Sequence, residues 1–236
     1  MTIHFSKVFI GYKEAKDLLK ACGIRFTENL ARVNSLLKSD CSAEFIKASY
    51  QNDYANMYKV ARDKYDYNIL LEEDESIIQI GYEKDSRKRV VELRYAFYEA
   101  PINILSYESF LKEHGLLYRD TGDLFYEEYE QYKNEASLKI SVTPIRYDFS
   151  YNQYNGIIHP ISHLHIGQSN NIRIPLSFIM TPKAFIAFIL RHIYWEKWKY
   201  YVEDQNFKEQ YLTAKGDERL DISLFGLDEQ KDIYLV

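Results

Sequence analysis

Apolar residues recur at steps of three and four along the first quarter of the chain, and this spacing is typical of one buried face of an α-helix. It is found in residues 12–22, 26–39 and 42–65. Ser42 stands where the third segment begins, and serine is a residue type that caps helices well. We therefore predict a helical N-terminal portion over residues 1–66.

After this portion the hydrophobic period changes to two, which favours β-strands. Residues 68–83 and 88–100 predict three strands joined by charged turns, and residues 137–149 continue the sheet. Between them, residues 105–135 return to a helical spacing. We therefore predict that residues 67–175 form mainly antiparallel sheet with inserted helices.

The most apolar stretch lies towards the end of the chain and has a clear helix start. Thr181 suits the N-cap and Pro182 suits the first helical position, so we predict one long helix from Thr181 to about Phe207 within residues 176–236. No linker rich in glycine and serine, low-complexity tract or internal repeat separates the parts. The sequence thus predicts a single α+β domain over residues 1–236.

The parity of the apolar positions changes at Thr143–Pro144. The apolar residues are Leu138, Ile140 and Val142 before this point and Ile145, Tyr147 and Phe149 after it. Such a slip predicts a bulge or an edge break, because side chains alternate between the two faces of a strand. Beyond the slip, Arg146 and Asp148 are expected to share the face opposite the apolar side chains.

The next two predicted strands alternate in the same way. His163 and His165 alternate with apolar residues in one strand, and Arg173 does so in the next. If one face is the core, four apolar residues must be buried on it and His165 must lie opposite Arg173, with a loop at 168–170. The four apolar residues are Leu164, Ile166, Ile172 and Ile174.

This register gathers ionisable residues on one face of the sheet. They are Arg146, Asp148, His163, His165 and Arg173. His159, held before Pro160, adds a third histidine just upstream. A solvated sheet face would also carry such residues, whereas a cluster of titratable groups is typical of a functional site.

Two chemistries fit this cluster. A two-histidine, one-carboxylate set of His163, His165 and Asp148 could bind zinc or manganese. Arg146 and Arg173 oppose a cation and favour an anion, since a guanidinium fork matches the oxygens of a phosphate. With one neutral and one protonated imidazole, cleavage of a phosphodiester needs no cofactor.

Composition limits the classes of protein that remain. Hydrophobic residues make up 46% of the chain, enough for a packed core, and the net charge of -5 argues against a protein that coats nucleic acid. Cys22 and Cys41 form no CxxC pair, so neither a disulfide framework nor a cysteine zinc site is indicated. The N-terminus has no signal-like segment, and the apolar run 184–195 is interrupted by Arg191 and His192. We expect a cytoplasmic protein that does not associate with membranes.

Four strings carry a resemblance to a known family: RYD, HPISHLHIG, NNIRIP and TPKAFIAFIL. They resemble a bacterial family of similar length, known only as a domain of unknown function, with an RYD, HPxSHxHxG and NxIRIP signature over most of the chain. More remotely, RYD followed by a histidine-rich segment is similar to small toxins of toxin–antitoxin pairs to which an action on RNA is attributed. That likeness implies active positions at Arg146, Asp148, His163 and His165.

These observations favour a bacterial enzyme that cleaves RNA or another phosphodiester, in a toxin–antitoxin or phage-defence setting. His163 and His165 would exchange protons, and Asp148 would orient a histidine or pair with Arg146. Arg146, Arg173 and His159 would hold the phosphate. One alternative is a non-catalytic subunit that binds a nucleotide, a nucleic acid or a partner protein such as a cognate antitoxin or another defence-system component. The other is a metal-dependent hydrolase.

Overall fold

The computed structural model describes residues 4–32, 36, 40–168, 172–216 and 219–235. Within them, seven strands form one antiparallel sheet in which each strand pairs with the next along the chain. The strands are β1 (Phe26–Glu28), β2 (Ile69–Leu71), β3 (Ile77–Lys84), β4 (Val90–Tyr98), β5 (Ile145–Ser150), β6 (Ser162–Ile166) and β7 (Arg173–Pro175). The sheet is therefore a meander, and the predicted α+β class is confirmed.

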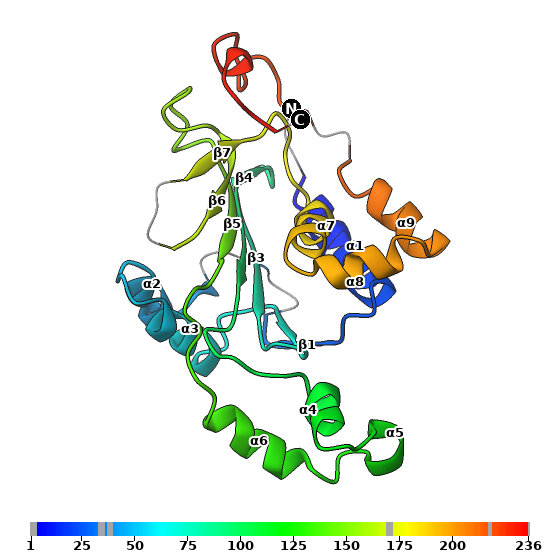
Figure 1. The fold of residues 1–236 in the computed structure, drawn as a ribbon. Coiled ribbons are helices and arrows are strands. Elements are labelled where there is room, and N and C mark those ends of the chain that lie inside the picture. The colour runs from blue at the N-terminus through cyan, green and yellow to red at the C-terminus, as the bar shows by residue number, and fades with distance from the viewer. Residues whose placement is uncertain (1–3, 33–35, 37–39, 169–171, 217–218, 236) are drawn as a thin grey trace.

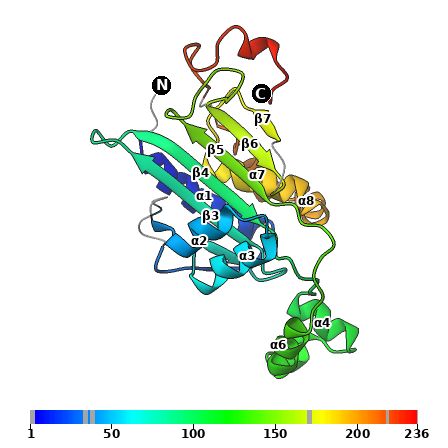
Figure 2. The same ribbon diagram turned by 90° about the vertical axis from the view of Figure 1, so that its left-hand side faces the viewer.

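Helices cover both faces of the sheet, as Figures 1 and 2 show. On one face lie α1 (Ser6–Ala21), α7 (Pro182–His192), α8 (Trp195–Tyr201) and α9 (Gln205–Leu212). On the other lie α2 (Ala43–Ser49) and α3 (Tyr54–Asp63). An insertion between β4 and β5 carries α4 (Tyr107–Glu113), α5 (Tyr118–Thr121) and α6 (Tyr126–Asn134), and it projects beyond the ends of the strands. No helix in the described ranges has both the length and the apolar character needed to cross a bilayer.

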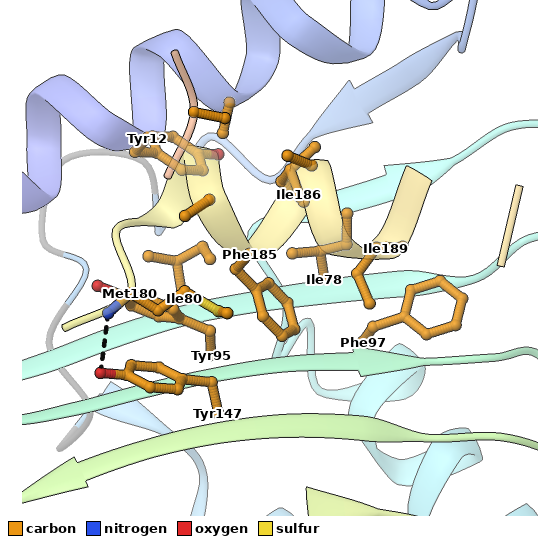
Figure 3. Close-up of a cluster of buried hydrophobic side chains, with 14 of the residues drawn as sticks. Tyr12, Ile78, Ile80, Tyr95, Phe97, Tyr147, Met180, Phe185, Ile186 and Ile189 are labelled. Atoms are coloured by element: carbon orange, nitrogen blue, oxygen red, sulfur yellow. Dashed lines mark hydrogen bonds between the residues drawn. The ribbon is translucent and has the colours of Figure 1, made fainter. Parts of the chain in front are cut away.

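The main core lies between the sheet and the pair α1 and α7 (Figure 3). The rings of Tyr95 and Phe185 lie 5.8 Å apart between centroids, and both side chains are fully buried. Burying a side chain such as Phe185 stabilises the fold by about 1.5–3 kcal/mol. The hydroxyl of Tyr147 accepts a hydrogen bond of 3.1 Å from the backbone N–H of Met180, so its burial leaves no orphaned oxygen. This packing fixes the strands that carry the polar face on their other side.

Two of the three segments predicted as helices in the N-terminal portion are helical. The spacing in residues 12–22 belongs to α1, and Ser42 caps α2 by accepting from the N–H of Phe45. The segment predicted as one helix over 42–65 is two helices, because Asp53 caps a new one at α3. The helix predicted over 26–39 is wrong where it begins: Phe26–Glu28 is the edge strand β1, and residues 33–35 and 37–39 lie outside the described residues.

The C-terminal part is helical, but the single long helix expected from Thr181 to Phe207 is wrong. Thr181 caps α7 and Pro182 opens it, as predicted. The chain then breaks into α8 and α9, and the side chain of Asp204 caps the last of these by accepting from the N–H of Phe207. A good internal N-cap thus interrupts an otherwise continuous apolar spacing.

The strand expected before Thr143 does not form. Leu138 makes only an isolated bridge with Ile102, and the side chain of Ile140 is fully exposed. Strand β5 begins directly after Pro144, so the change of parity marks the start of a strand and not a bulge within one. The odd-numbered apolar residues that follow are buried, as predicted.

The predicted burial of four apolar residues in β6 and β7 is correct only in part. Leu164 is fully buried, Ile166 and Ile174 are half-buried, and Ile172 is 45% exposed. Strand β7 begins only at Arg173, so Ile172 lies outside the sheet at its edge. Of the predicted loop at 168–170, residues 169 and 170 lie outside the described residues.

Candidate functional site

The register of β5, β6 and β7 brings the predicted polar residues together. Asp148 pairs with His163, and Arg146 pairs with His165. His165 also pairs with Arg173 across the next strand boundary, which confirms that prediction. Directly opposed residues of antiparallel strands point to the same face, so all five side chains share one face of the sheet.

Asp148 is the centre of the charge network on this face. Its carboxylate accepts hydrogen bonds of 3.0 Å from Nε of Arg94 and 2.8 Å from Nε of Arg146, and Nε2 of His165 lies 3.2 Å from it. Burial by itself would raise the pKa of the Asp148 carboxyl. The hydrogen bond from His165 and the charges of Arg146 and Arg94 outweigh burial and hold that pKa well below its usual range. The carboxylate therefore stays ionised.

The hydrogen bonds of the two histidines define their tautomers. Nδ1 of His163 lies 2.8 Å from the carbonyl oxygen of Pro160, which can only accept, so Nδ1 carries the proton. Burial lowers the pKa of His163 to about 4, and its Nε2 is therefore an unprotonated acceptor near neutral pH. Nε2 of His165, 3.0 Å away, must then carry a proton that it shares between His163 and Asp148. The result is a relay that orients the ring of His165.

A cavity of about 610 Å³ opens between this face and the helices α2 and α3. Among the described residues, its lining contains three arginines and one aspartate but neither lysine nor glutamate. The charged residues are Arg94, Arg146, Arg173 and Asp148, and His159 and His165 line the cavity beside them. The cavity is therefore locally basic in a chain whose net charge is -5. A hollow of about 580 Å³ near Lys20 and Glu72 contains none of these residues.

The predicted residues differ in their access to the cavity. His163 is 1% exposed and does not line it, whereas the half-buried His165 does. The ring of His159 packs edge to face on His163 with centroids 4.9 Å apart, and its buried Nδ1 has no hydrogen-bond partner among the described residues. Burial and the charge of Arg173 lower the pKa of His159. Arg173 is exposed and makes no ion pair with a described residue.

Our sequence reasoning missed Arg94 and Tyr98, which also line the cavity. Leu93, Tyr95 and Phe97 of β4 are odd-numbered and lie in the main core, so the even-numbered Arg94 lies on the opposite face. Its pairing with Asp148 could not be read from the sequence, because the α4 to α6 insertion separates β4 from β5. The alternation of apolar and polar residues in the strands also did not indicate that α2 and α3 lie opposite this face of the sheet.

The same cluster contains three side chains of types that ligate metals. One donor atom each from Asp148, His163 and His165 lies within 4.8 Å of the others. The hydrogen bond from Nδ1 of His163 to a backbone carbonyl also resembles those that orient metal-bound histidines. The donor types therefore fit zinc or manganese. The surroundings fit a cation poorly, because two guanidinium groups already donate to the carboxylate.

Comparison with models of protein families matches residues 26–224 to the family described as "Uncharacterized conserved protein (DUF2290)". No curated protein and no solved structure matches the chain.

Proposed function

Because the chain belongs to the DUF2290 family of uncharacterized conserved proteins, whose description assigns no activity, we propose a function from the cavity itself: cleavage of an RNA phosphodiester. The observation that supports this proposal best is that three arginines and an oriented histidine line one cavity of an acidic chain. Such a cavity attracts a phosphate locally, without a basic surface elsewhere.

The arginines have separate roles in this proposal. Arg146 uses Nε on Asp148, which holds its side chain and leaves the terminal nitrogens for a phosphate oxygen. Arg173 has no carboxylate partner among the described residues and lies opposite His165. A phosphodiester between these two guanidinium groups would lie against the histidine that lines the cavity.

The 2′-hydroxyl of RNA supplies the nucleophile. A neutral imidazole takes its proton, O2′ attacks phosphorus, and the bond from phosphorus to the 5′-oxygen breaks. A protonated imidazole then gives a proton to the leaving 5′-oxygen, and the product is a 2′,3′-cyclic phosphate. We assign these transfers to His165 and His159, since both line the cavity.

His163 has a different role from the proton exchange with substrate that we expected. It is buried behind His165 and neutral, so it acts as a positioning residue that accepts from Nε2 of His165. Asp148 shares that task and holds two arginines in place. Nε2 of His165 is already engaged with His163 and Asp148. Nδ1 of His165 is therefore the nitrogen that exchanges a proton with the substrate.

The resemblance of the RYD and HxH strings to RNA-directed toxins supports the choice of RNA. Those strings stand on the paired strands β5 and β6, where they build the charge network described above. We extend the proposal to a toxin–antitoxin or phage-defence setting, with a cognate antitoxin or another defence component as the partner. The resemblance to these toxins is the support for that setting.

Purified protein incubated with labelled RNA and with DNA of the same sequence, each with and without EDTA, tests the activity. We expect cleavage of RNA alone, unaffected by EDTA. His165→Ala should lower the rate by about 10²-fold to 10⁴-fold, as expected for loss of a general acid or base. His4→Ala, a change at an exposed histidine away from the cavity, is the matched control and should leave the rate unchanged. Intact RNA in all samples would refute the proposal.

The second candidate is a metal-dependent hydrolase, favoured by the convergence of Asp148, His163 and His165. In that case EDTA abolishes cleavage and zinc or manganese restores it. Binding of RNA without cleavage under either condition would instead support a non-catalytic binding subunit.

A further inference from the structure

The cavity has a second wall that a phosphate alone does not require. Ile46 of α2 and Tyr50 at its C-terminal end both line the cavity, opposite the arginines of the sheet. Ile46 is 45% exposed and Tyr50 is 86% exposed, so neither is needed in the core. An apolar and aromatic wall facing three arginines suits a ligand that has both an anionic and a planar apolar part.

Behind this wall, buried aromatic side chains pack between α2 and the sheet. The rings of Phe45 and Tyr98 meet edge to face with centroids 6.2 Å apart, and both are nearly buried. Gln168 reaches across from the end of β6 and donates from Nε2 to Sδ of Met57 at 3.6 Å. Gln153 also lines the cavity, so amide groups that can both donate and accept stand beside the aromatic wall.

We propose that this wall is a base subsite, which takes one unpaired base of a single-stranded RNA while the arginines hold the neighbouring phosphate. The inference rests on the proposed function and specifies its substrate class. Tyr50 offers an exposed ring on which a base stacks, and stacking on an aromatic side chain tolerates any base. Gln153 and Gln168 contact the base edge with their amide groups.

The strand must be single for three physical reasons. A base in a duplex has both faces covered by its neighbours and its pairing edge occupied, so it cannot stack on Tyr50. A cavity of about 610 Å³ is also of the size that encloses a small ligand, not a double helix. Duplex binders spread their contacts over a broad basic surface, which a chain of net charge -5 does not favour.

The test uses an oligonucleotide that the proposed chemistry cannot cleave. A fluorescein-labelled single-stranded 2′-O-methyl RNA of eight nucleotides lacks the 2′-hydroxyl nucleophile, so its binding can be measured by anisotropy whether or not the protein cleaves RNA. We expect the single strand to bind at least tenfold more tightly than the same strand annealed to its complement. AMP should compete at lower concentration than inorganic phosphate, because only AMP has a base.

Variants of two exposed tyrosines provide the matched comparison. Tyr50→Ala should weaken binding of the single strand about tenfold. Tyr200→Ala, at a 76% exposed tyrosine of α8 on the other face of the sheet, should leave it unchanged. Equal affinity for single strand and duplex, an unchanged affinity in Tyr50→Ala, or equal competition by phosphate and AMP would each overturn the base subsite. Failure to cleave RNA while these binding results hold would overturn the proposed activity alone.

Discussion

The Nε2 atoms of His163 and His165 lie 3.0 Å apart, so two basic nitrogens on one strand face each other at hydrogen-bond distance. Only one of them can carry a proton in that contact. The carbonyl of Pro160 keeps the proton of His163 on Nδ1, and Asp148 attracts the proton on Nε2 of His165. The hydrogen bond between the two rings therefore requires a neutral His163, and it is lost when His163 becomes protonated.

This geometry predicts that the protein loses stability between pH 6.5 and 4. Burial lowers the folded-state pKa of His163 to about 4, whereas a histidine in the unfolded chain has a pKa of about 6.5. The unfolded state binds more protons in this range, so the stability present above pH 6.5 falls as the pH falls towards 4. The full difference corresponds to about 3 kcal/mol. Urea unfolding at several pH values measures it.

The contribution of His163 is isolated by comparison of variants. His163→Gln should show a shallower loss of unfolding free energy between pH 6.5 and 4 than the wild type, whereas His4→Gln should follow the wild type. Asp148 does not obscure the result, because its depressed folded-state pKa places its own loss of stability below about pH 4. Parallel curves for wild type and His163→Gln would contradict the assignment.

The polar face could be predicted because strand alternation is a local rule. The positions of Arg146, Asp148, His163 and His165 follow from parity once the core face is known, and the structure agrees. The contribution of Arg94 depends on the pairing of β4 with β5, which is not local in sequence. The burial of His163 could not be predicted from strand alternation either, since its ring is contacted by His159 and by the carbonyl of Pro160.

Helix ends show the same distinction between local and tertiary signals. Caps at Ser42 and Thr181 were read correctly, because the capping side chain and its backbone partner are three residues apart. Breaks before α3 and α9 were missed although Asp53 and Asp204 cap them, since apolar spacing continues across both. Residues 137–142 alternate as a strand does, yet among the described residues they pair with a neighbouring segment only at the isolated bridge between Leu138 and Ile102.

We predict that Asp148→Asn destabilises the fold by about 3 kcal/mol, the order expected when one partner of a buried ion pair is removed. The change leaves the guanidinium groups of Arg94 and Arg146 without their counter-charge, although each is more than a third exposed and water moderates the cost. The free energy of unfolding in urea measures the effect. Asp228→Asn, at a 78% exposed ion pair with Lys231, should change it by less than about 0.5 kcal/mol. A similar small change at Asp148 would show that the network is not structural.

We predict that Arg173→Lys weakens the binding of phosphate-containing ligands without loss of stability. The side chain is exposed and has no ion-pair partner among the described residues, so the fold does not depend on it. A lysine keeps the charge but cannot form the bidentate fork that matches a phosphate. Affinity for the single-stranded 2′-O-methyl probe should fall about tenfold, an effect of about 1.4 kcal/mol. Arg87→Lys, in the exposed turn between β3 and β4, is the control, and equal affinities for the two variants would count against the phosphate clamp.

A third stability prediction concerns the contact between α1 and α7. A Cβ atom added at Gly11 would lie 2.7 Å from Cδ of Pro182, closer than carbon atoms approach each other. Alanine normally stabilises a helix relative to glycine by about 1 kcal/mol, but here the rigid proline ring must move. We expect Gly11→Ala to lower the free energy of unfolding by about 1–2 kcal/mol, as overpacking does. At Gly226 the nearest atom would lie 3.7 Å away, so Gly226→Ala should be close to neutral; a stabilised Gly11→Ala would show that the helices can separate freely.

The last prediction decides between the two uses of Asp148, His163 and His165. The carboxylate already accepts from two guanidinium groups, and a divalent cation placed among these side chains would lie close to both positive charges. The protein is dialysed against EDTA and then titrated with zinc in a calorimeter. We expect it to bind less than one equivalent of zinc at micromolar affinity. If zinc instead binds stoichiometrically, His165→Ala should abolish binding and Arg94→Gln should strengthen it, since the variant removes an opposing charge. That pair of results would identify the cluster as a metal site, and the relay between His163 and His165 would then be the metal-free arrangement of its ligands.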